Sequence, residues 1–422
     1  MEEIQAKFNQ MKKATHKLRV SLFFGYNGKN YRGLQFHDQQ GIETVEKSVF
    51  QALIDGGFIL SQHMGDVKNV SWTRGARTDK GVHALVNTVS LKMNIDEQKF
   101  INPPTQEQLD LYKDQEERAL NQQNQKQKNK KLQQLQSMKS NDRLKNIDFK
   151  KIKNVINSHL PNDIKLFSVK PVTAGFNVRH AARSRKYVNK IKINNNFRWP
   201  PTFVEYYMPL RVFQSYNNYK ENKQYTEEEE QQILEKIQKV IDVYKGTKNY
   251  HNFTIKIRAK DPEAVRYMIE LKANIVQNEQ KTEKWVRFQL HGASFMYHQI
   301  RKMIGMVAML FQKELPIQFC ENAFFQNHVP IWLAPAEGLF LNRITFDGYN
   351  KKGDVPVPLI LDEEDEKEVE KFRVYLQDDV ILNSSAVFDD FITHFMELSD
   401  EQIDEEQQKE KESKQNDEID NE

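Results

Sequence analysis

Cysteine is almost absent from this sequence, because Cys320 is the single cysteine among 422 residues. One thiol cannot build a disulfide framework or a multi-cysteine zinc site, and its isolation is consistent with a reducing compartment. The sequence also lacks any run of about 18 apolar residues, so we expect no transmembrane helix and no membrane partner. Residues 1–17 lack the apolar core of a signal peptide, so we expect no secretory leader.

Positive charge dominates most of the chain, although the formal net charge is only +3. Residues 400–422 contain eleven acidic residues and three lysines, a net charge of −8, which leaves +11 for residues 1–399. A body this basic favours a polyanionic partner such as nucleic acid. The alternative is an ordinary solvated surface that is followed by an acidic disordered tail.

Apolar periodicity predicts a mixture of strands and helices. Thr44 and the Gly56-Gly57 pair are typical of the start and the end of a helix. Alternating apolar residues predict strands at 18–24, 88–93, 268–276 and 286–290, and helical spacing predicts helices at 300–311 and 387–396. No βαβ nucleotide-binding unit and no repeat of fixed period is present. The pattern therefore predicts the α+β class, with sheets covered on one face by helices.

Residues 102–148 interrupt these patterns with glutamine, asparagine and lysine. Between residues 121 and 150 there are eight basic and two acidic side chains. Such a composition cannot bury a core, so we predict a low-complexity basic insertion that is disordered or loosely helical. We expect no active site within it.

The segment Arg74–Leu85, RGARTDKGVHAL, is the most informative stretch of the sequence. Gly75 and Gly81 flank Asp79, and glycines in such positions allow a tight loop whose backbone approaches a ligand. Asp79 is one carboxylate among three cations, so it should stay ionised and could meet a phosphodiester without repelling it. The alternative is an ordinary Asp-x-Gly turn with no chemical role.

The string RTDKGVHA, residues 77–84, resembles the catalytic signature of the TruA family of tRNA pseudouridine synthases. Five further segments resemble family motifs in family order: GYNGKNYRGLQ at 25–35, HLPNDIKL at 159–166, FNVRHAARSRKY at 176–187, GASFMYHQIRKMIG at 292–305 and APAEGLFL at 334–341. The segments 244–256 and 261–268 are similar to the eukaryotic multisite tRNA enzymes of this family. The resemblance covers residues 16–100 and 150–350, most of the chain expected to be ordered.

The resemblance implies an α+β fold of two ferredoxin-like halves. These halves would share a bent antiparallel sheet, with the active site in a central cleft and additional helices at the C-terminal end. We accordingly divide the chain into a disordered N-terminus (1–15), an N-terminal catalytic half (16–100), the low-complexity basic insertion (101–149), a C-terminal catalytic half (150–345), a C-terminal helical extension (346–399) and an acidic disordered tail (400–422).

The resemblance also implies the site residues. Asp79 would be the essential catalytic carboxylate, and Arg301 would face Asp79 and keep it ionised and oriented. Tyr187 would give the uracil an aromatic face, and Arg77 would fill the gap left by the base or hold the adjacent phosphate. Without the resemblance, packing is the better explanation of Tyr187 and solvation the better explanation of Arg301. We expect no cofactor and no metal, and we assign His83 and His298 no catalytic role.

The function implied is isomerisation of specific uridines to pseudouridine in tRNA, with snRNA and mRNA left open as further substrates. We expect a monomer in the nucleus, with a mitochondrial pool as the alternative location. Three rivals remain: a catalytically inactive RNA-binding or RNA-folding protein with the same fold, an enzyme restricted to the lower anticodon arm, and a basic scaffold that binds RNA through residues 121–150.

Overall fold

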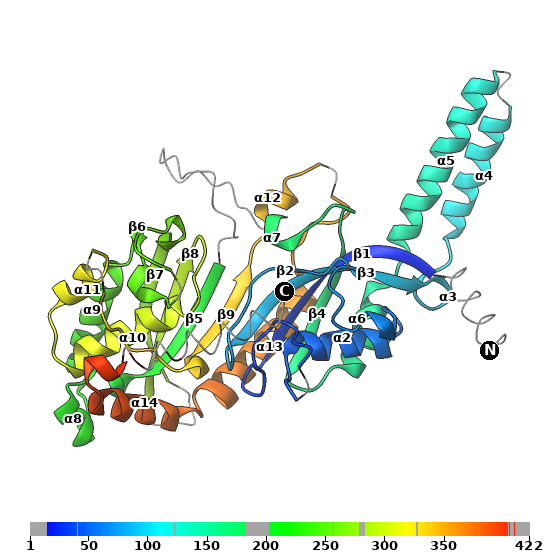
Figure 1. Cartoon of the computed structure of the whole chain (residues 1–422). Coiled ribbons are helices and arrows are strands. Elements are labelled where there is room, and N and C mark those ends of the chain that lie inside the picture. Colours follow the sequence, from blue (N-terminus) through cyan, green and yellow to red (C-terminus); the bar gives the residue numbers. More distant parts are fainter. Residues whose placement is uncertain are drawn as a thin grey trace.

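The chain folds around one large mixed sheet with helices packed against it (Figure 1). The computed structural model describes residues 15–39, 41–121, 124–181, 202–255, 257–277, 283–325, 328–353 and 355–403, together with 405 and 409. Within these residues the sheet has nine strands in the order β4-β1-β3-β9-β5-β8-β7-β6, and β2 pairs with β3. The predicted mixture of strands and helices is therefore confirmed.

The first half of the sheet is made by strands that come early in the chain. They are β1 (Thr15–Tyr26), β2 (Thr73–Arg74), β3 (His83–Asp96) and β4 (Ile164–Pro171), and the helices beside them are α2 (Val45–Asp55), α3 (Glu97–Phe100), α6 (Phe149–His159) and α7 (Val178–Ala181), with the short helix η1 (Ser61–His63). Helix α2 begins where the sequence predicts, because the Thr44 side chain accepts a hydrogen bond from the backbone N–H of Lys47.

The second half contains the remaining strands. They are β5 (Thr202–Pro209), β6 (Gly246–Asn249), β7 (Val265–Gln277), β8 (Lys284–Gly292) and β9 (Leu339–Ile344), with the helices α8 (Tyr216–Lys220), α9 (Glu227–Asp242), α10 (Gln299–Gln312), α11 (Ile317–Asn322) and α12 (Asp347–Asn350) and the short helices η2 (Leu210–Phe213), η3 (His251–Phe253), η4 (Pro262–Ala264) and η5 (Ala336–Gly338). Helix α10 is almost entirely buried. A Cβ at Gly305 would lie 2.0 Å from the carbonyl oxygen of Trp332, so glycine allows α10 to pack directly against the backbone before η5.

The two halves join where β3 runs parallel to β9. The parallel register consists of two residue pairs, His83 with Phe340 and Ala84 with Leu341. All other strand pairs of the described sheet are antiparallel. The expectation of a purely antiparallel sheet is therefore wrong at this junction, because β9 enters from the far end of the chain in the same direction as β3.

His83 lies in this junction and is completely buried. Its Nδ1 accepts a hydrogen bond of 3.0 Å from the backbone N–H of Gly28. Burial lowers the pKa of His83 from 6.5 to about 4, so the ring is neutral at pH 7. The histidine thus connects the loop after β1 to the strand that holds the halves together.

A band of C-terminal helices runs along both halves, on the lower side of the molecule in Figure 1. It consists of α13 (Glu363–Val374), the π-helix η6 (Tyr375–Ile381) and α14 (Ser385–Glu397). At the first half, the buried Lys153 of α6 pairs with Asp365 at 3.4 Å. At the second half, Arg211 pairs with Asp389 at 2.8 Å. The band therefore fixes the two halves relative to each other.

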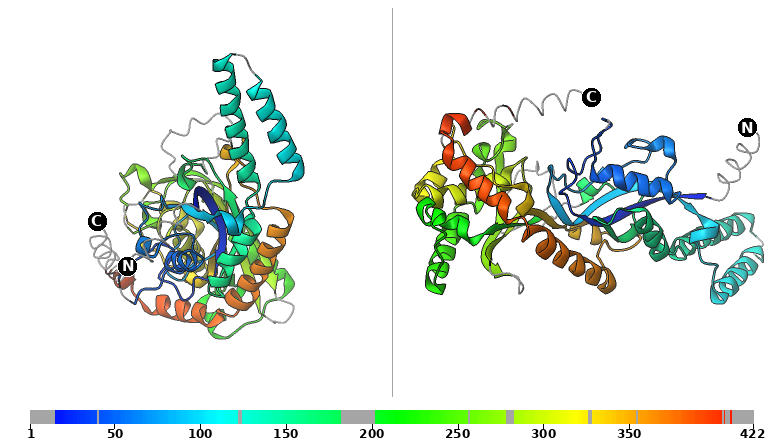
Figure 2. Two further views of the ribbon diagram at one scale, coloured as in Figure 1. Left: turned by 90° about the vertical axis from the view of Figure 1, so that its right-hand side faces the viewer. Right: turned by 90° about the horizontal axis from the view of Figure 1, so that it is seen from below.

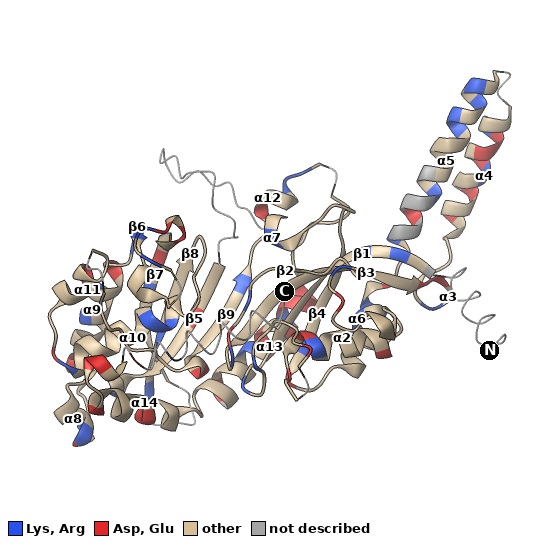
Figure 3. Ribbon diagram, in the orientation of Figure 1, with Lys and Arg blue, Asp and Glu red and all other residues tan. Residues whose placement is uncertain are grey.

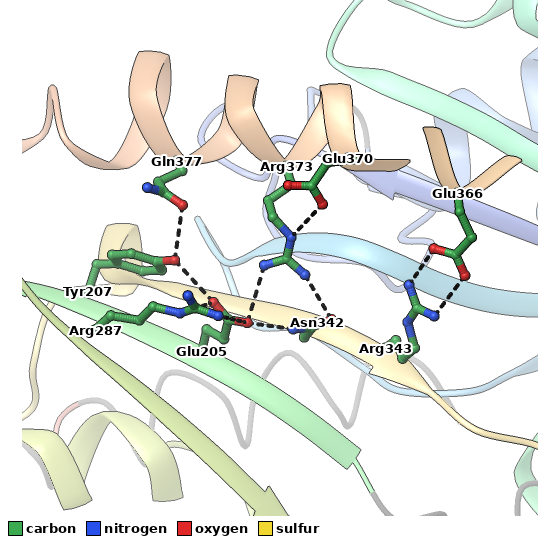
Figure 4. Close-up of polar contacts among 9 residues, drawn as sticks. All are labelled: Glu205, Tyr207, Arg287, Asn342, Arg343, Glu366, Glu370, Arg373 and Gln377. Atoms are coloured by element: carbon green, nitrogen blue, oxygen red, sulfur yellow. Dashed lines mark hydrogen bonds and ion pairs between the residues drawn. The ribbon is translucent and has the colours of Figure 1, made fainter. Parts of the chain in front are cut away.

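The middle of this band is held by the buried carboxylate of Glu205, on β5 (Figure 4). Glu205 forms ion pairs with Arg287 of β8 at 2.9 Å and with Arg373 of α13 at 3.2 Å. It also accepts hydrogen bonds from Asn342 of β9 and Tyr207. A buried charge with this many partners is expensive to disrupt, about 3–5 kcal/mol when one partner is removed.

Residues within the insertion form a helical hairpin that projects from the sheet (Figures 1 and 2). Its helices are α4 (Gln106–Leu120) and α5 (Gln125–Lys145). At its base, Ile101 bridges Ile147, and the Asn102 N–H donates to the Asn146 carbonyl at 2.9 Å. The composition of this segment predicts disorder or a loose helix, and the structure has two paired helices, which agrees with the helical alternative.

The closed base of the hairpin generates a first prediction. Replacing residues 106–145 with a short Gly/Ser linker should preserve folding, because the base already brings the ends of the excised segment together. Circular dichroism and urea unfolding would measure this. A broad, non-cooperative transition in the shortened protein would contradict it and would make the hairpin a structural element.

The burial of His83 generates a second prediction. Its pKa is lower in the folded than in the unfolded chain, so its stabilising effect is complete above pH 6.5 and is lost as the pH falls toward 4. The free energy of unfolding should fall by about 2 kcal/mol from this group between pH 7 and pH 5. His83→Asn retains an acceptor for Gly28, so it should lower stability at pH 7 but flatten this pH dependence.

Urea unfolding at both pH values would test the role of His83. The matched control is His159→Asn, since His159 is exposed on α6 and its replacement should leave the pH dependence of the wild type unchanged. An equally steep loss of stability in His83→Asn and in the wild type would contradict the assignment.

Candidate functional site

A cavity of about 540 Å³ lies between the two halves of the sheet. The first half contributes the loop after β1 and the loop between β2 and β3, and the second half contributes β5, β9 and the start of α10. This volume lies within the usual range of small-ligand sites, roughly 300–1,000 Å³. The cavity therefore has the size of a site for one small molecule or one nucleotide unit.

One acidic and four basic side chains carry the formal charge of the described cavity lining. Asp79 is the single acidic residue among the described residues that line it, whereas four lining residues are cationic: Arg32, Arg77, Lys80 and Arg301. The Asp79 side chain is 23% exposed. The structure thus brings three of the predicted site residues to one cavity, namely Asp79, Arg77 and Arg301. Tyr187 lies outside the described residues.

The loop that carries Asp79 is anchored by side chains of the adjacent strands. The Tyr26 hydroxyl lies 2.7 Å from the Thr78 hydroxyl. Asn87 of β3 donates to the carbonyl of Ala76 at 2.9 Å and to the Tyr26 hydroxyl at 3.2 Å. Both Tyr26 and Asn87 are completely buried. These contacts hold residues 76–78 rigidly and place Asp79 at the cavity surface.

The loop after β1 supports the same residues from the other side. The Leu34 N–H donates to the carbonyl of Thr78 at 3.2 Å, and the Gly81 N–H donates to the carbonyl of Tyr31. Gly33 has φ +112°, and a Cβ there would lie 2.8 Å from the Thr78 carbonyl oxygen. Glycine at 33 is therefore required both by the backbone conformation and by the close approach of the two loops.

Glu46 of α2 connects the helix to the start of this loop. Its carboxylate is fully buried and accepts hydrogen bonds from Arg74 at 2.5 and 2.7 Å, from the Trp72 indole at 2.7 Å and from the Phe36 N–H at 2.8 Å. A buried carboxylate with charge-assisted partners fixes geometry strongly. Sequence reasoning missed Glu46, because a glutamate in the first turn of a helix is usually solvent-exposed.

His298 forms the opposite wall, just before α10. Its Nε2 lies 3.8 Å from a carboxylate oxygen of Asp79, and its side chain is 1% exposed. Its backbone is left-handed, with φ 60°, and its ring stacks on Tyr297 at 3.7 Å. Burial, Arg301 and Lys302 lower its pKa to about 2, so the ring is neutral. This residue, to which the sequence pattern assigns no role, lies beside Asp79.

The segment 251–254 supports this wall from behind. The Thr254 hydroxyl donates to the carbonyl of Tyr297 at 2.9 Å. Lys302 is buried and donates to the carbonyl of Asn252 at 3.3 Å. From the sequence alone, the region around 251–254 indicates only a resemblance to the eukaryotic multisite tRNA enzymes. In the structure it stabilises the turn that places Tyr297 and His298 in the cavity.

Arg301 extends from the first turn of α10. Its Nε donates to the carbonyl of Ala334 at 2.6 Å, and the Ala334 N–H donates to the Arg301 carbonyl at 3.3 Å. The backbone next to η5 therefore orients the guanidinium group, which also lines the cavity. Arg301 and Asp79 line the same cavity, and a direct contact between their side chains stays a prediction.

The described part of the chain contains no group of three or more His, Cys, Asp or Glu side chains that could hold a metal ion. In the same residues, no helix combines the length and the apolar character needed to cross a membrane. The charged side chains that line the described cavity are one carboxylate and four cations, and the neutral imidazole of His298 lies beside the carboxylate.

The chain is similar in sequence to known proteins. Residues 240–347 match the family described as "tRNA pseudouridine synthase". The chain is 28% identical over 397 residues to "tRNA pseudouridine synthase 1" of Candida glabrata, covering 80% of this chain and 62% of that protein. The protein of the same name in Yarrowia lipolytica is 30% identical, with 80% and 65% covered.

A human relative is similar to the same extent. "Pseudouridylate synthase 1 homolog" of Homo sapiens is 28% identical over 334 residues, covering 79% of this chain and 61% of that protein. The chain spans about three fifths of the length of these relatives. Residues 240–347 thus resemble the tRNA pseudouridine synthase family, and about four fifths of the chain is similar in sequence to eukaryotic proteins named tRNA pseudouridine synthase 1 or pseudouridylate synthase 1 homolog.

Proposed function

We propose that this protein is an isomerase that converts specific uridines of tRNA to pseudouridine, with Asp79 as the catalytic carboxylate. The observation that carries this proposal is the composition of the cavity, which is lined by one carboxylate and four cations. The cations suit the phosphates of an RNA strand, and the carboxylate suits an attack or a proton transfer at a single nucleotide. The names of the homologues support tRNA as the substrate.

The proposed reaction breaks the C1′–N1 bond of a uridine, turns the base and forms a C1′–C5 bond. The C5 proton is then lost and N1 regains a proton, so atoms and electrons balance without a redox partner. The uridine has to leave its stack first, which costs a few kcal/mol. Asp79 acts either as a nucleophile or as a base toward the sugar, and both roles require its ionised form.

The other residues have separate roles in this proposal. Arg77, which is exposed at the cavity, holds the adjacent phosphate or fills the gap left by the uridine. Tyr187 stacks on the uracil, a contact worth about 1–3 kcal/mol. Arg301 orients Asp79, and the neutral ring of His298 excludes water from one side of the carboxylate.

We further propose the fold of the two halves, the oligomeric state, the compartment and the range of substrates. The two parts of the sheet correspond to two ferredoxin-like halves, and the C-terminal band favours a monomer. We retain the nucleus as the expected compartment and snRNA and mRNA as candidate further substrates. The rival is an inactive RNA-binding protein with the same fold. The convergence of Asp79, Arg77 and Arg301 on one cavity argues against it, since RNA binding alone does not need the carboxylate.

Asp79→Ala should abolish pseudouridine formation and leave tRNA affinity within about tenfold of the wild type, because phosphate contacts dominate binding. Single-turnover assays on unmodified tRNA would measure the first effect and fluorescence anisotropy the second. Asp163→Ala is a control carboxylate change outside the cavity. Measurable turnover by Asp79→Ala would refute the assignment of the catalytic residue.

Arg301→Ala should cut the single-turnover rate severely, and the rate should begin to fall at a higher pH on the acid side, because Asp79 loses a neighbouring cation. Arg301→Lys keeps the charge but loses the planar fork, so it should restore the pH dependence more than the rate. Tyr187→Phe should leave the pH dependence unchanged. A near-normal rate with an unshifted pH profile in Arg301→Ala would remove Arg301 from the site.

A further inference from the structure

The hairpin of α4 and α5 is not part of the cavity or of the packing of the sheet. Its helices are held together mainly by their own contacts, among them the buried Leu135 and Ala119 and a hydrogen bond of 3.1 Å from Tyr112 to Asp142. It meets the rest of the molecule at the base formed by Ile101 and Ile147. A mostly polar helix pair that projects into solvent contributes little to the core.

The charges of the hairpin are segregated between its helices (Figure 3). Helix α4 has five acidic and two basic residues, whereas α5 has seven basic residues and one acidic residue. Several of these charges neutralise one another: Lys139 pairs with Glu116 at 3.6 Å, Arg118 with Asp114 at 2.9 Å and Lys145 with Asp142 at 3.0 Å. These pairs lie on α4 and on the later turns of α5.

The first turns of α5 have a different character. The segment 125–131, QKQKNKK, contains four lysines and no acidic residue, and it lies at the outer end of the hairpin. Lys126, Lys130 and Lys131 are exposed and Lys128 is half-buried. Within the described part of the chain, none of the four forms an ion pair. We refer to Lys126, Lys128, Lys130 and Lys131 as the tip lysines.

We propose that the tip lysines form a second RNA-binding surface that contacts the phosphate backbone of the substrate tRNA outside the cavity. Lysine is a compact point charge on a flexible stem, which suits phosphates without reading sequence. The segment 125–131 has no apolar side chain, so it lacks the apolar face that a membrane-surface helix would insert.

The length of the hairpin allows the tip lysines to contact RNA far from the sheet. Helix α5 has 21 residues, which at 1.5 Å per residue corresponds to a length of about 31 Å. The cavity also carries an excess of positive charge, so one polyanion can satisfy both surfaces. This inference rests on the proposed function in one respect only, namely that the polyanion is the RNA that enters the cavity.

The test removes the charge of the tip lysines and keeps the helix. In a variant with all four changed to Gln, the Kd for unmodified tRNA should rise about tenfold near 0.1 M salt. The slope of log K against log salt should become shallower by about 2 to 3, since each lost phosphate contact removes nearly one unit. Changing the same four residues to Arg should preserve both the affinity and the slope.

A matched control removes the same charge elsewhere. Lys220, Lys239, Lys367 and Lys371 are exposed on α8, α9 and α13, and their joint change to Gln should leave the tRNA affinity much less affected. Equal losses in both quadruple variants would show an effect of net charge alone and would overturn the proposal. An unchanged Kd and slope in the tip variant would also overturn it.

A direct contact can be mapped with one cysteine. Cys320 is buried, so Asn129→Cys would introduce a single exposed thiol for a photocrosslinker. We expect crosslinks to tRNA nucleotides other than the uridine that is isomerised. Labelling without any tRNA crosslink would contradict the inference, and so would preferential capture of polyglutamate, which would assign the tip to an acidic protein.

The single-turnover rate at saturating protein separates this inference from the proposed function. The tip variant should reach the wild-type rate once its weaker binding is overcome. If the wild type forms no pseudouridine in any tRNA while the tip variant still loses tRNA affinity, the proposed function fails and the second surface stands. Normal turnover with unchanged tRNA affinity in the tip variant would overturn the second surface and support the proposed function.

Discussion

The site depends on the short parallel ladder between β3 and β9. Two residue pairs join strands that are more than 240 positions apart in the chain, and the cavity opens beside them. The loop with Asp79 leads into β3, and Leu339 and Leu341 of β9 line the same cavity. Any shift between the halves would therefore change the distance between Asp79 and the wall formed by His298 and Arg301.

Two buried polar clusters stabilise this arrangement from different directions. Glu46 fixes the loop before Asp79 through Arg74 and Trp72, and Glu205 fixes the C-terminal band behind the sheet through Arg287 and Arg373. Each is a carboxylate that is desolvated and fully surrounded by donors. Such clusters specify geometry more than they add net stability, because their desolvation offsets much of the attraction. Fixed geometry of this kind is what the proposed role of Asp79 would require.

Positive charge is concentrated in two places on the molecule, the cavity and the outer end of the hairpin. In the cavity, four cations and one carboxylate line the same space, an arrangement that suits the RNA strand of the proposed function. At the end of the hairpin, the tip lysines have no ion-pair partner in the described residues, so their charge is available to solvent or to a polyanion. The acidic residues after 400 have the opposite sign, and they partly balance the basic body in the formal charge.

The sequence by itself determined several of the strands and helices, and it suggested a chemistry for the site that stays a proposal. Period-two and helical spacing depend on near neighbours, so the strand at 18–24, the cap at Thr44 and the helix around 300–311 were predictable, and the string around Asp79 indicated its chemistry. Only the tertiary structure decided which distant residues meet. His298 came beside Asp79 through a left-handed turn, Glu46 became buried, and the insertion folded back on itself as a hairpin. These outcomes depend on contacts between segments far apart in the chain, and local patterns carry no information about such contacts.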